Sequence, residues 1–169
     1  MMADIYISFF EKQLERVNYW LAYSETKNAA MIALNVAMIA ALTAASLTSG
    51  LYKLALVILL IAILVSLISF WPYLGNTISK KEKTQIAKNF IYFKDISYID
   101  NEDSYVDYVN TYYFDGEAPK SSKKWVADLA KEIIYNSRLA SQKFLLFRIT
   151  LALDIASVLF IGIQFLLLL

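Results

Sequence analysis

Three apolar stretches of about 20 residues each constrain the fold of this chain more than any other feature. They cover residues 29–49, 54–73 and 149–169, and none of them contains Lys or Arg. At a rise of about 1.5 Å per residue, a helix of this length crosses the hydrocarbon core of a bilayer. Because 59% of the 169 residues are hydrophobic, one small soluble core cannot bury all three stretches. The sequence therefore predicts three transmembrane helices.

The segments around these spans predict helical extensions. Residues 1–28 are expected to form a cytoplasmic amphipathic arm, and residues 74–148 a cytoplasmic helical section. Neither Pro nor Gly occurs before Gly50, so the arm should continue into the first span. We expect an all-α membrane protein whose first and third transmembrane helices extend into a cytoplasmic stem region. The apolar seam of the arm and its more polar continuation consist of Ile7, Phe10, Leu14, Val17, Leu21, Ser24, Asn28, Met31 and Asn35.

Within the central section, two further helices are expected. Tyr105, Tyr108 and Tyr112 recur at helical spacing and favour a short amphipathic helix over residues 102–114. Gly116 and Pro119 indicate a turn. A long helix should follow, capped by Ser121 or Ser122 and continuing into the third span. Its predicted seam comprises Val126, Leu129, Ile133, Asn136, Ala140 and Phe144. Strands around residues 90–93 remain an alternative.

The distribution of basic residues predicts the orientation. Eleven Lys or Arg lie between Lys80 and Lys143 in the central section and three in the arm, whereas the short connection between the first two spans carries only Lys53. The positive-inside rule therefore places the arm, with the N-terminus, and the central section in the cytoplasm. We expect no cleavable signal peptide. The basic run Lys80, Lys81 and Lys83 is either a topology signal that contacts anionic lipid or a contact for nucleotide phosphates.

The composition argues against catalysis. The chain has no Cys and no His, which removes thiolate chemistry, the usual general base and the commonest metal ligand. Four dispersed glycines cannot form a phosphate-binding loop, and a net charge of +1 offers no field for a nucleic-acid polymer. The carboxylates of Asp100, Glu102 and Asp103 are either a solvated acidic turn or a divalent-cation site. We expect no enzyme, no metal and no cofactor.

Polar residues inside the spans are candidate gating positions. Asn35 and Asp154 each lie about six residues into a span, and Gln164 lies near the far end of the third. An acid at such depth costs a few kcal/mol unless it finds a partner or water. Asp154 either reaches the interface or pairs with Arg148, or it faces a helix interface or a water-filled path in an oligomer together with Asn35. Small residues of the first span would allow close approach of a neighbouring helix.

The aromatic segment from residue 90 to 114 has two interpretations. Its rings either form the core of a small cytoplasmic domain or provide a stacking platform for a base or cyclic nucleotide. In the second case the partners of the phosphate would be Lys94, Lys120, Lys123 and Lys124.

Several short segments, in this order around three spans, resemble the Pycsar-type transmembrane effectors of bacterial antiphage cyclic-nucleotide systems. They are Glu25-Thr26-Lys27-Asn28 with Ile32-Ala33-Leu34-Asn35, Pro72, Asn89-Phe90-Ile91-Tyr92-Phe93-Lys94-Asp95-Ile96-Ser97, and Asp128-Leu129 through Asn136-Ser137 to Lys143. The resemblance covers the chain from about residue 5 onward. No β-rich cyclic-nucleotide-binding domain is evident, so either the helical section senses the ligand or another protein does.

The resemblance implies a multi-pass protein of the bacterial inner membrane that responds to a nucleotide second messenger. As a homo-oligomer it would impair membrane integrity, by a pore or other disruption, and arrest the infected cell. The candidate ligand is a cyclic nucleotide or cyclic oligonucleotide, and the bilayer is a further partner. The family-like positions are Lys27, Asn35, Phe93, Asp95, Asp128, Asn136, Ser137 and Lys143. With the aromatic and basic neighbours, the candidate ligand-binding residues are Lys27, Tyr92, Phe93, Lys94, Asp95, Lys120, Lys124, Asn136 and Lys143.

A second interpretation of the same helices is a membrane adaptor or scaffold that does not permeabilise the bilayer. It would recruit a cytoplasmic partner through the seams of the arm and the stem. Charged residues at Leu14 or Ile133 would then abolish function, whereas Asp154→Leu would not. The effector interpretation predicts loss in both cases.

Overall fold

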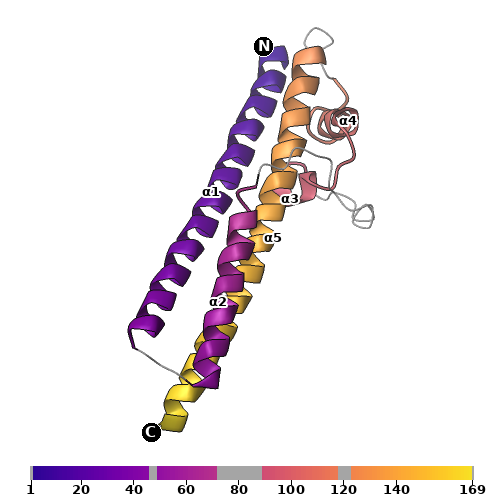
Figure 1. Ribbon diagram of the computed structural model, residues 1–169. Helices are drawn as coiled ribbons and strands as arrows, with labels where there is room; N and C mark the ends of the chain where they lie inside the picture. The colour runs from indigo at the N-terminus through magenta and orange to yellow at the C-terminus, as the bar shows by residue number, and fades with distance from the viewer. Residues whose placement is uncertain (1, 46–48, 72–88, 118–122, 169) are drawn as a thin grey trace. The chain divides into compact units, whose positions relative to one another are not determined.

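Helices are the only regular secondary structure in the described part of this protein. A computed structural model describes residues 2–45, 49–71, 89–117 and 123–168 (Figure 1). It is 87% helical, and these residues contain no strand. The helices are α1 (Met2–Ala44), α2 (Gly50–Ile68), α3 (Phe93–Ile96), α4 (Glu102–Tyr113) and α5 (Lys123–Leu168). Three of them, α1, α2 and α5, are long and apolar enough to cross a membrane, which confirms the predicted fold class.

The chain divides into two compact units, and both α1 and α5 contribute residues to each. Unit 1 comprises Met1–Tyr23 and Tyr73–Ser141, and unit 2 comprises Ser24–Pro72 and Gln142–Leu169. Several expectations, namely the basic run at residues 80–83 and Pro119, Lys120, Ser121 and Ser122, lie outside the described residues.

Unit 1 packs the first part of α1 and of α5 with α3 and α4. Its core contains side chains from all four helices, and it is fully enclosed at Phe10, Val17, Ile96, Tyr105, Val109 and Ile133. The seam of α5 is confirmed at Val126, Leu129, Ile133 and Ala140, whereas Asn136 and Phe144 are half-buried.

Local sequence signals explain the ends of α4. The Asn101 side chain accepts a hydrogen bond from the Ser104 amide at 2.8 Å, and Glu102 and Asp103 follow in the first turn. Acidic residues there interact favourably with the positive end of the helix dipole. After the last turn, Asp115 and Gly116 adopt φ values of 51° and 81°, which stop the helix. The predicted helix and turn are therefore confirmed.

Two details of unit 1 differ from expectation. Strands were an alternative for residues 90–93, but residues 90–92 form bends and Phe93 begins the short helix α3. In α1, the buried positions of the arm are Tyr6, Phe10, Gln13 and Val17, whereas Ile7 and Leu14 are half-buried. At two positions the buried residue is therefore the one before the predicted residue: Tyr6 in place of Ile7, and Gln13 in place of Leu14. The reason is that Tyr6 packs on Phe114, at 4.8 Å between ring centroids, while Gln13 donates a hydrogen bond to the Ile91 carbonyl at 2.7 Å.

Unit 2 consists of the rest of α1 with α2 and the rest of α5. Ser49 caps α2 by accepting a hydrogen bond from the Tyr52 amide at 3.4 Å. Ala55, Leu59 and Ala62 form the fully buried face of α2. The continuation of the α1 seam is confirmed, because Ser24, Asn28 and Asn35 are fully enclosed and Met31 is 7% exposed.

Candidate functional site

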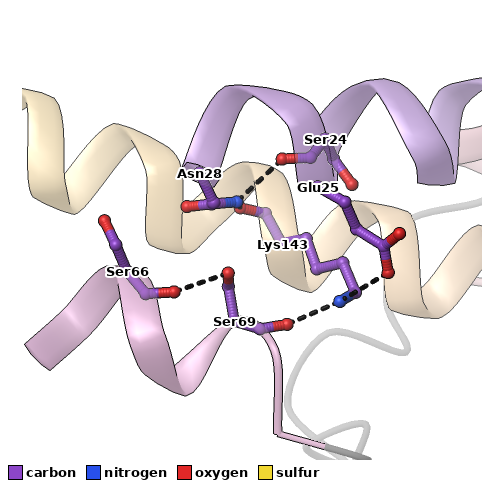
Figure 2. A network of polar contacts seen from close by, with 6 residues as sticks. All are labelled: Ser24, Glu25, Asn28, Ser66, Ser69 and Lys143. Atoms are coloured by element: carbon purple, nitrogen blue, oxygen red, sulfur yellow. Dashed lines mark hydrogen bonds and ion pairs between the residues drawn. The ribbon is translucent and has the colours of Figure 1, made fainter. Parts of the chain in front are cut away.

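Lys143 is the centre of a polar network in unit 2 that joins three helices (Figure 2). Its Nζ lies 3.0 Å from Glu25 Oε1 of α1 and donates to the Ser69 carbonyl at the end of α2, at 2.5 Å. The same ammonium group lies 5.6 Å from the centroid of the Phe70 ring. Only 12% of the Lys143 side chain is exposed. The ammonium charge is therefore shielded from solvent, and it interacts with the Glu25 carboxylate, the Ser69 carbonyl and the Phe70 ring.

The amide of Asn28 adds a second link between α1 and α5 in this network. Its Nδ2 donates to the Ser24 carbonyl at 2.9 Å and to the Lys143 carbonyl at 3.1 Å. Next to it in the chain, Lys27 holds its ammonium group 4.8 Å from the Phe147 ring centroid. Two of the predicted ligand-binding residues, Lys27 and Lys143, are thus engaged within the protein.

Beyond the network, a line of polar residues continues along α5. Thr150, Asp154 and Ser157 follow at intervals of four and three residues, which places them on one helix face. All three are buried. The Thr150 hydroxyl shares a hydrogen bond of 2.9 Å with the Ser66 hydroxyl of α2, and the Ser157 hydroxyl donates to the Ala55 carbonyl at 3.3 Å. These hydrogen bonds tie α5 to α2 within apolar segments.

Asp154 is the exception on this line, because its carboxylate has no hydrogen-bond partner among the described residues. The residue is 5% exposed, and its polar neighbour is the fully enclosed Asn35 of α1. The two side chains lie close together, but neither Asn35 amide atom makes a hydrogen bond with ideal geometry. Arg148 is exposed, and the Asp154 carboxylate makes no ion pair with it among the described residues. Gln164, the third predicted gating residue, is half-exposed.

In unit 1, the aromatic segment forms a stack around Phe90. The Phe90 ring lies nearly parallel to the rings of Tyr108 and Tyr112, with centroid distances of 5.2 and 5.4 Å. The Tyr105 hydroxyl donates to the Phe90 carbonyl at 2.8 Å, and burial strongly raises the pKa of this tyrosine. Phe90 and Tyr105 belong to the core, whereas Tyr112 is 66% exposed. The buried rings fit the interpretation as a domain core, and the exposed Tyr112 ring leaves a stacking platform open as the alternative.

The segment 92–95 turns two of its four side chains inward. Phe93 is buried against Trp20, at 5.6 Å between centroids, and Asp95 Oδ2 accepts a hydrogen bond from the Asn89 amide at 3.0 Å. Tyr92 and Lys94 are exposed. The family-like positions Phe93 and Asp95 therefore stabilise this turn, and Tyr92 and Lys94 are the residues that remain accessible to a ligand.

On the α5 side of unit 1, the predicted residues lie apart. Lys124 forms an exposed ion pair with Asp128 at 3.4 Å, and the Asn136 amide donates to the Asn18 side chain at 2.8 Å. Ser137 is fully enclosed. The Arg138 guanidinium, which the sequence did not single out, donates to the Ile99 and Asp100 carbonyls at 2.6 and 3.1 Å. Burial lowers the pKa of Arg138, against the opposing effect of Asp100.

The candidate ligand-binding residues are divided between the two units. Tyr92, Phe93, Lys94, Asp95, Lys124 and Asn136 belong to unit 1, Lys27 and Lys143 belong to unit 2, and Lys120 lies outside the described residues. The sequence patterns missed Ser66, Thr150 and Ser157, although their spacing along buried faces would have been a signal. No group of three metal-binding side chains occurs in the described parts of the chain.

Comparison with known proteins agrees with the three-span architecture. The family model PycTM, described as the Pycsar effector protein domain, matches residues 9–168. No curated protein and no solved structure matches the chain. Because the family match covers nearly the whole chain, including all three apolar helices, this protein belongs to the Pycsar effector family, the membrane effectors of antiphage cyclic-nucleotide signalling.

Proposed function

We propose that this effector acts as a homo-oligomer in the bacterial inner membrane, where it impairs membrane integrity when a nucleotide signal arrives. The observation that carries the proposal is the construction of α1 and α5. Each is one continuous helix whose residues belong both to unit 1, with its polar surface, and to unit 2, with its apolar spans. A rearrangement of unit 1 is therefore linked to two of the three spans through unbroken helices.

The exposed face of α1 supports the oligomer. Its exposed positions in the span are largely alanines, namely Ala29, Ala30, Ala33, Ala37, Ala40, Ala41 and Ala44. The exposed positions of α2 are mostly large, for example Leu60 and Leu64. Small residues let helix backbones approach closely in a bilayer, so α1 is the face that a second copy would contact.

Charge supports an orientation with the N-terminus and unit 1 in the cytoplasm, where a nucleotide messenger would be present. Fifteen of the sixteen Lys and Arg residues lie in the arm and the central section. In unit 1, the exposed Tyr92 and Lys94 beside the Phe90 stack offer a π-face and a cation for such a ligand.

Dye release from proteoliposomes tests the proposal directly. We expect leakage from vesicles that contain the full chain when cyclic mononucleotides or cyclic oligonucleotides are added on the unit 1 side. In infected cells, loss of membrane potential should accompany growth arrest. The proposal fails if the protein arrests growth on infection while potential and dye exclusion stay unchanged.

Paired variants separate this effector from the adaptor interpretation. Asp154→Leu alters only the span, whereas Leu14→Glu alters the arm. If the protein is an effector, both variants should lose function. If it is an adaptor, only Leu14→Glu should lose function. Asp107→Asn, at an exposed position of α4, is the matched control that should behave as wild type. The burial of Val17 and Ile133 in the core of unit 1 disfavours an adaptor that docks through these seams.

A further inference from the structure

In the described part of unit 2, Asn35 and Asp154 have more unpaired buried polar atoms than any other residue. Asn35 is fully enclosed and Asp154 is 5% exposed, and both lie in helices apolar enough to cross a membrane. The two side chains lie close together, but neither carboxylate oxygen and neither amide atom makes a contact that meets full hydrogen-bond geometry among the described residues. Buried polar groups are nearly always paired, and an unpaired buried carboxylate is among the most costly defects a protein can carry. The contact between the two side chains therefore leaves most of their hydrogen-bonding capacity unused.

No basic side chain in the described part of unit 2 supplies the missing positive charge. Lys143 lies eleven residues before Asp154, about three turns along α5, and it is engaged by Glu25 and the Ser69 carbonyl. Arg148 is exposed. The counter-charge of Asp154 is thus absent from the residues that the structure describes.

The surrounding side chains offer oxygen atoms. Besides the two carboxylate oxygens, Asn35 provides an amide oxygen with free lone pairs. Thr150, four residues before Asp154, and Ser157, three residues after it, lie on the same face of α5. Both hydroxyl groups take part in a hydrogen bond with α2 and still have lone pairs to share. Carboxylate, amide and hydroxyl oxygens are the ligands preferred by hard cations.

We propose that Asn35 and Asp154 bind a small monovalent cation of the sodium type inside unit 2. The single negative charge of Asp154 indicates a monovalent ion. One carboxylate neutralises one positive charge, whereas a divalent ion would leave a net charge in a low-dielectric environment. The cation would contact Asn35 of α1 and Asp154 of α5 together, and it would tie the two helices to each other. This inference does not depend on the proposed function.

Binding of ²²Na⁺ to the full-length wild-type protein in nanodiscs tests the proposal without any variant. The ionic strength is held constant by exchanging NaCl for choline chloride. We expect saturable binding that unlabelled Na⁺ displaces and choline does not. Thermal unfolding, followed by tryptophan fluorescence, should show Tm rising by about 5–10 °C at 100 times the Kd. The absence of saturable binding overturns the proposal and leaves the pair satisfied by water or a proton.

Variants locate the site. Asp154→Asn keeps the shape of the side chain and removes its charge, so Na⁺ affinity should fall at least about tenfold, with no Na⁺-dependent change in Tm. Asn35→Leu should also weaken binding. Asp107→Asn makes the same chemical change at an exposed position of α4 and should bind as wild type. Equal binding by wild type and Asp154→Asn overturns the assignment, and displacement of Na⁺ by lower concentrations of Ca²⁺ overturns the monovalent preference.

Discussion

The ammonium group of Lys143 lies 3.0 Å from the carboxylate of Glu25. Two uncharged groups also bond to this lysine, one to its side chain and one to its backbone. Lys143 also donates to the Ser69 carbonyl, while the Lys143 carbonyl accepts from Asn28 (Figure 2). One residue of α5 therefore contacts α1 through its side chain and its backbone, and the end of α2 through its side chain. The Lys143 side chain is only 12% exposed, so water can replace few of these contacts.

Replacing Lys143 by Met should destabilise unit 2 by about 2 kcal/mol, because a hydrogen bond from a charged donor is lost and the Ser69 carbonyl keeps no partner. Glu25→Gln should cost only about 0.5 kcal/mol, since Glu25 is 45% exposed. Unfolding by SDS, monitored by circular dichroism in detergent micelles, measures both changes. Lys124→Met, which breaks the exposed pair with Asp128, is the control and should change stability by less than about 0.5 kcal/mol. Equal effects of the two Lys variants would mean that the buried contacts of Lys143 stabilise the protein no more than an exposed ion pair does.

Tyr105→Phe should weaken unit 1 and reduce its sensitivity to alkali. Removal of the hydroxyl leaves the buried Phe90 carbonyl unpaired, at a cost of about 1–2 kcal/mol at neutral pH. Burial, and then the charge of Tyr113, raise the pKa of Tyr105 in the folded protein. The folded state therefore holds this proton more tightly than the unfolded state does. The resulting stability is complete below about pH 10, the ordinary tyrosine pKa, and is lost as the pH rises above it.

A pH series of Tm between about pH 8 and pH 11 measures this effect. The wild type should lose stability more steeply than Tyr105→Phe over the alkaline part of the series. Tyr112→Phe, which removes a hydroxyl from a residue that is 66% exposed, serves as the control and should follow the wild-type curve. Parallel curves for wild type and Tyr105→Phe would show that this hydroxyl does not titrate on unfolding.

The seam of α1 shows how far the sequence could predict this fold. Helical periodicity and the absence of Pro and Gly were sufficient for the continuous helix, and they placed Asn28 and Asn35 on its buried face. The periodicity predicted that Leu14 is buried, and not Gln13, because only apolar side chains were counted as candidates for the buried face. Gln13 is buried since it finds the Ile91 carbonyl, 78 residues away, and no local pattern reveals such a partner.

The candidate site was less predictable for the same reason. The sequence singled out Asp154 and Asn35 as polar residues at similar depth, and the structure makes them neighbours. The ligand-binding set depended on the resemblance, which orders short motifs along the chain but gives no distances between them. Lys143 was included as a candidate ligand-binding residue, and its partners in the structure are Glu25, Ser69 and Phe70.

Tyr6→Phe should be neutral or stabilising by up to about 1 kcal/mol, in contrast to Tyr105→Phe. The Tyr6 hydroxyl is buried and has no hydrogen-bond partner among the described residues, so its removal relieves a desolvated polar group. The ring contacts with Phe10 and Phe114, at 5.3 and 4.8 Å between centroids, are kept. Chemical denaturation of both variants in parallel measures the difference, with Phe10→Ala as a core control that should cost about 3–5 kcal/mol. A clear destabilisation by Tyr6→Phe would mean that its hydroxyl is satisfied.

The hydrogen bond between Ser66 and Thr150 should couple α2 to α5 by about 0.6–1.7 kcal/mol. Thr150→Val preserves the shape of the side chain but leaves the Ser66 hydroxyl unpaired in an apolar segment, and Ser66→Ala does the converse. Once one hydroxyl is absent, removal of the other should cost little, so the double variant should be less destabilised than the sum of the singles. SDS unfolding of the four proteins gives the coupling energy.

Thr43→Val is the matched control for this cycle, because that hydroxyl bonds to the Ile39 carbonyl of its own helix and is exposed. Its removal should leave the coupling between α2 and α5 unchanged. Additivity of Ser66→Ala and Thr150→Val within about 0.3 kcal/mol would show that the two hydroxyl groups contribute independently. The link between the helices would then depend on the apolar contacts of the buried α2 face formed by Ala55, Leu59 and Ala62.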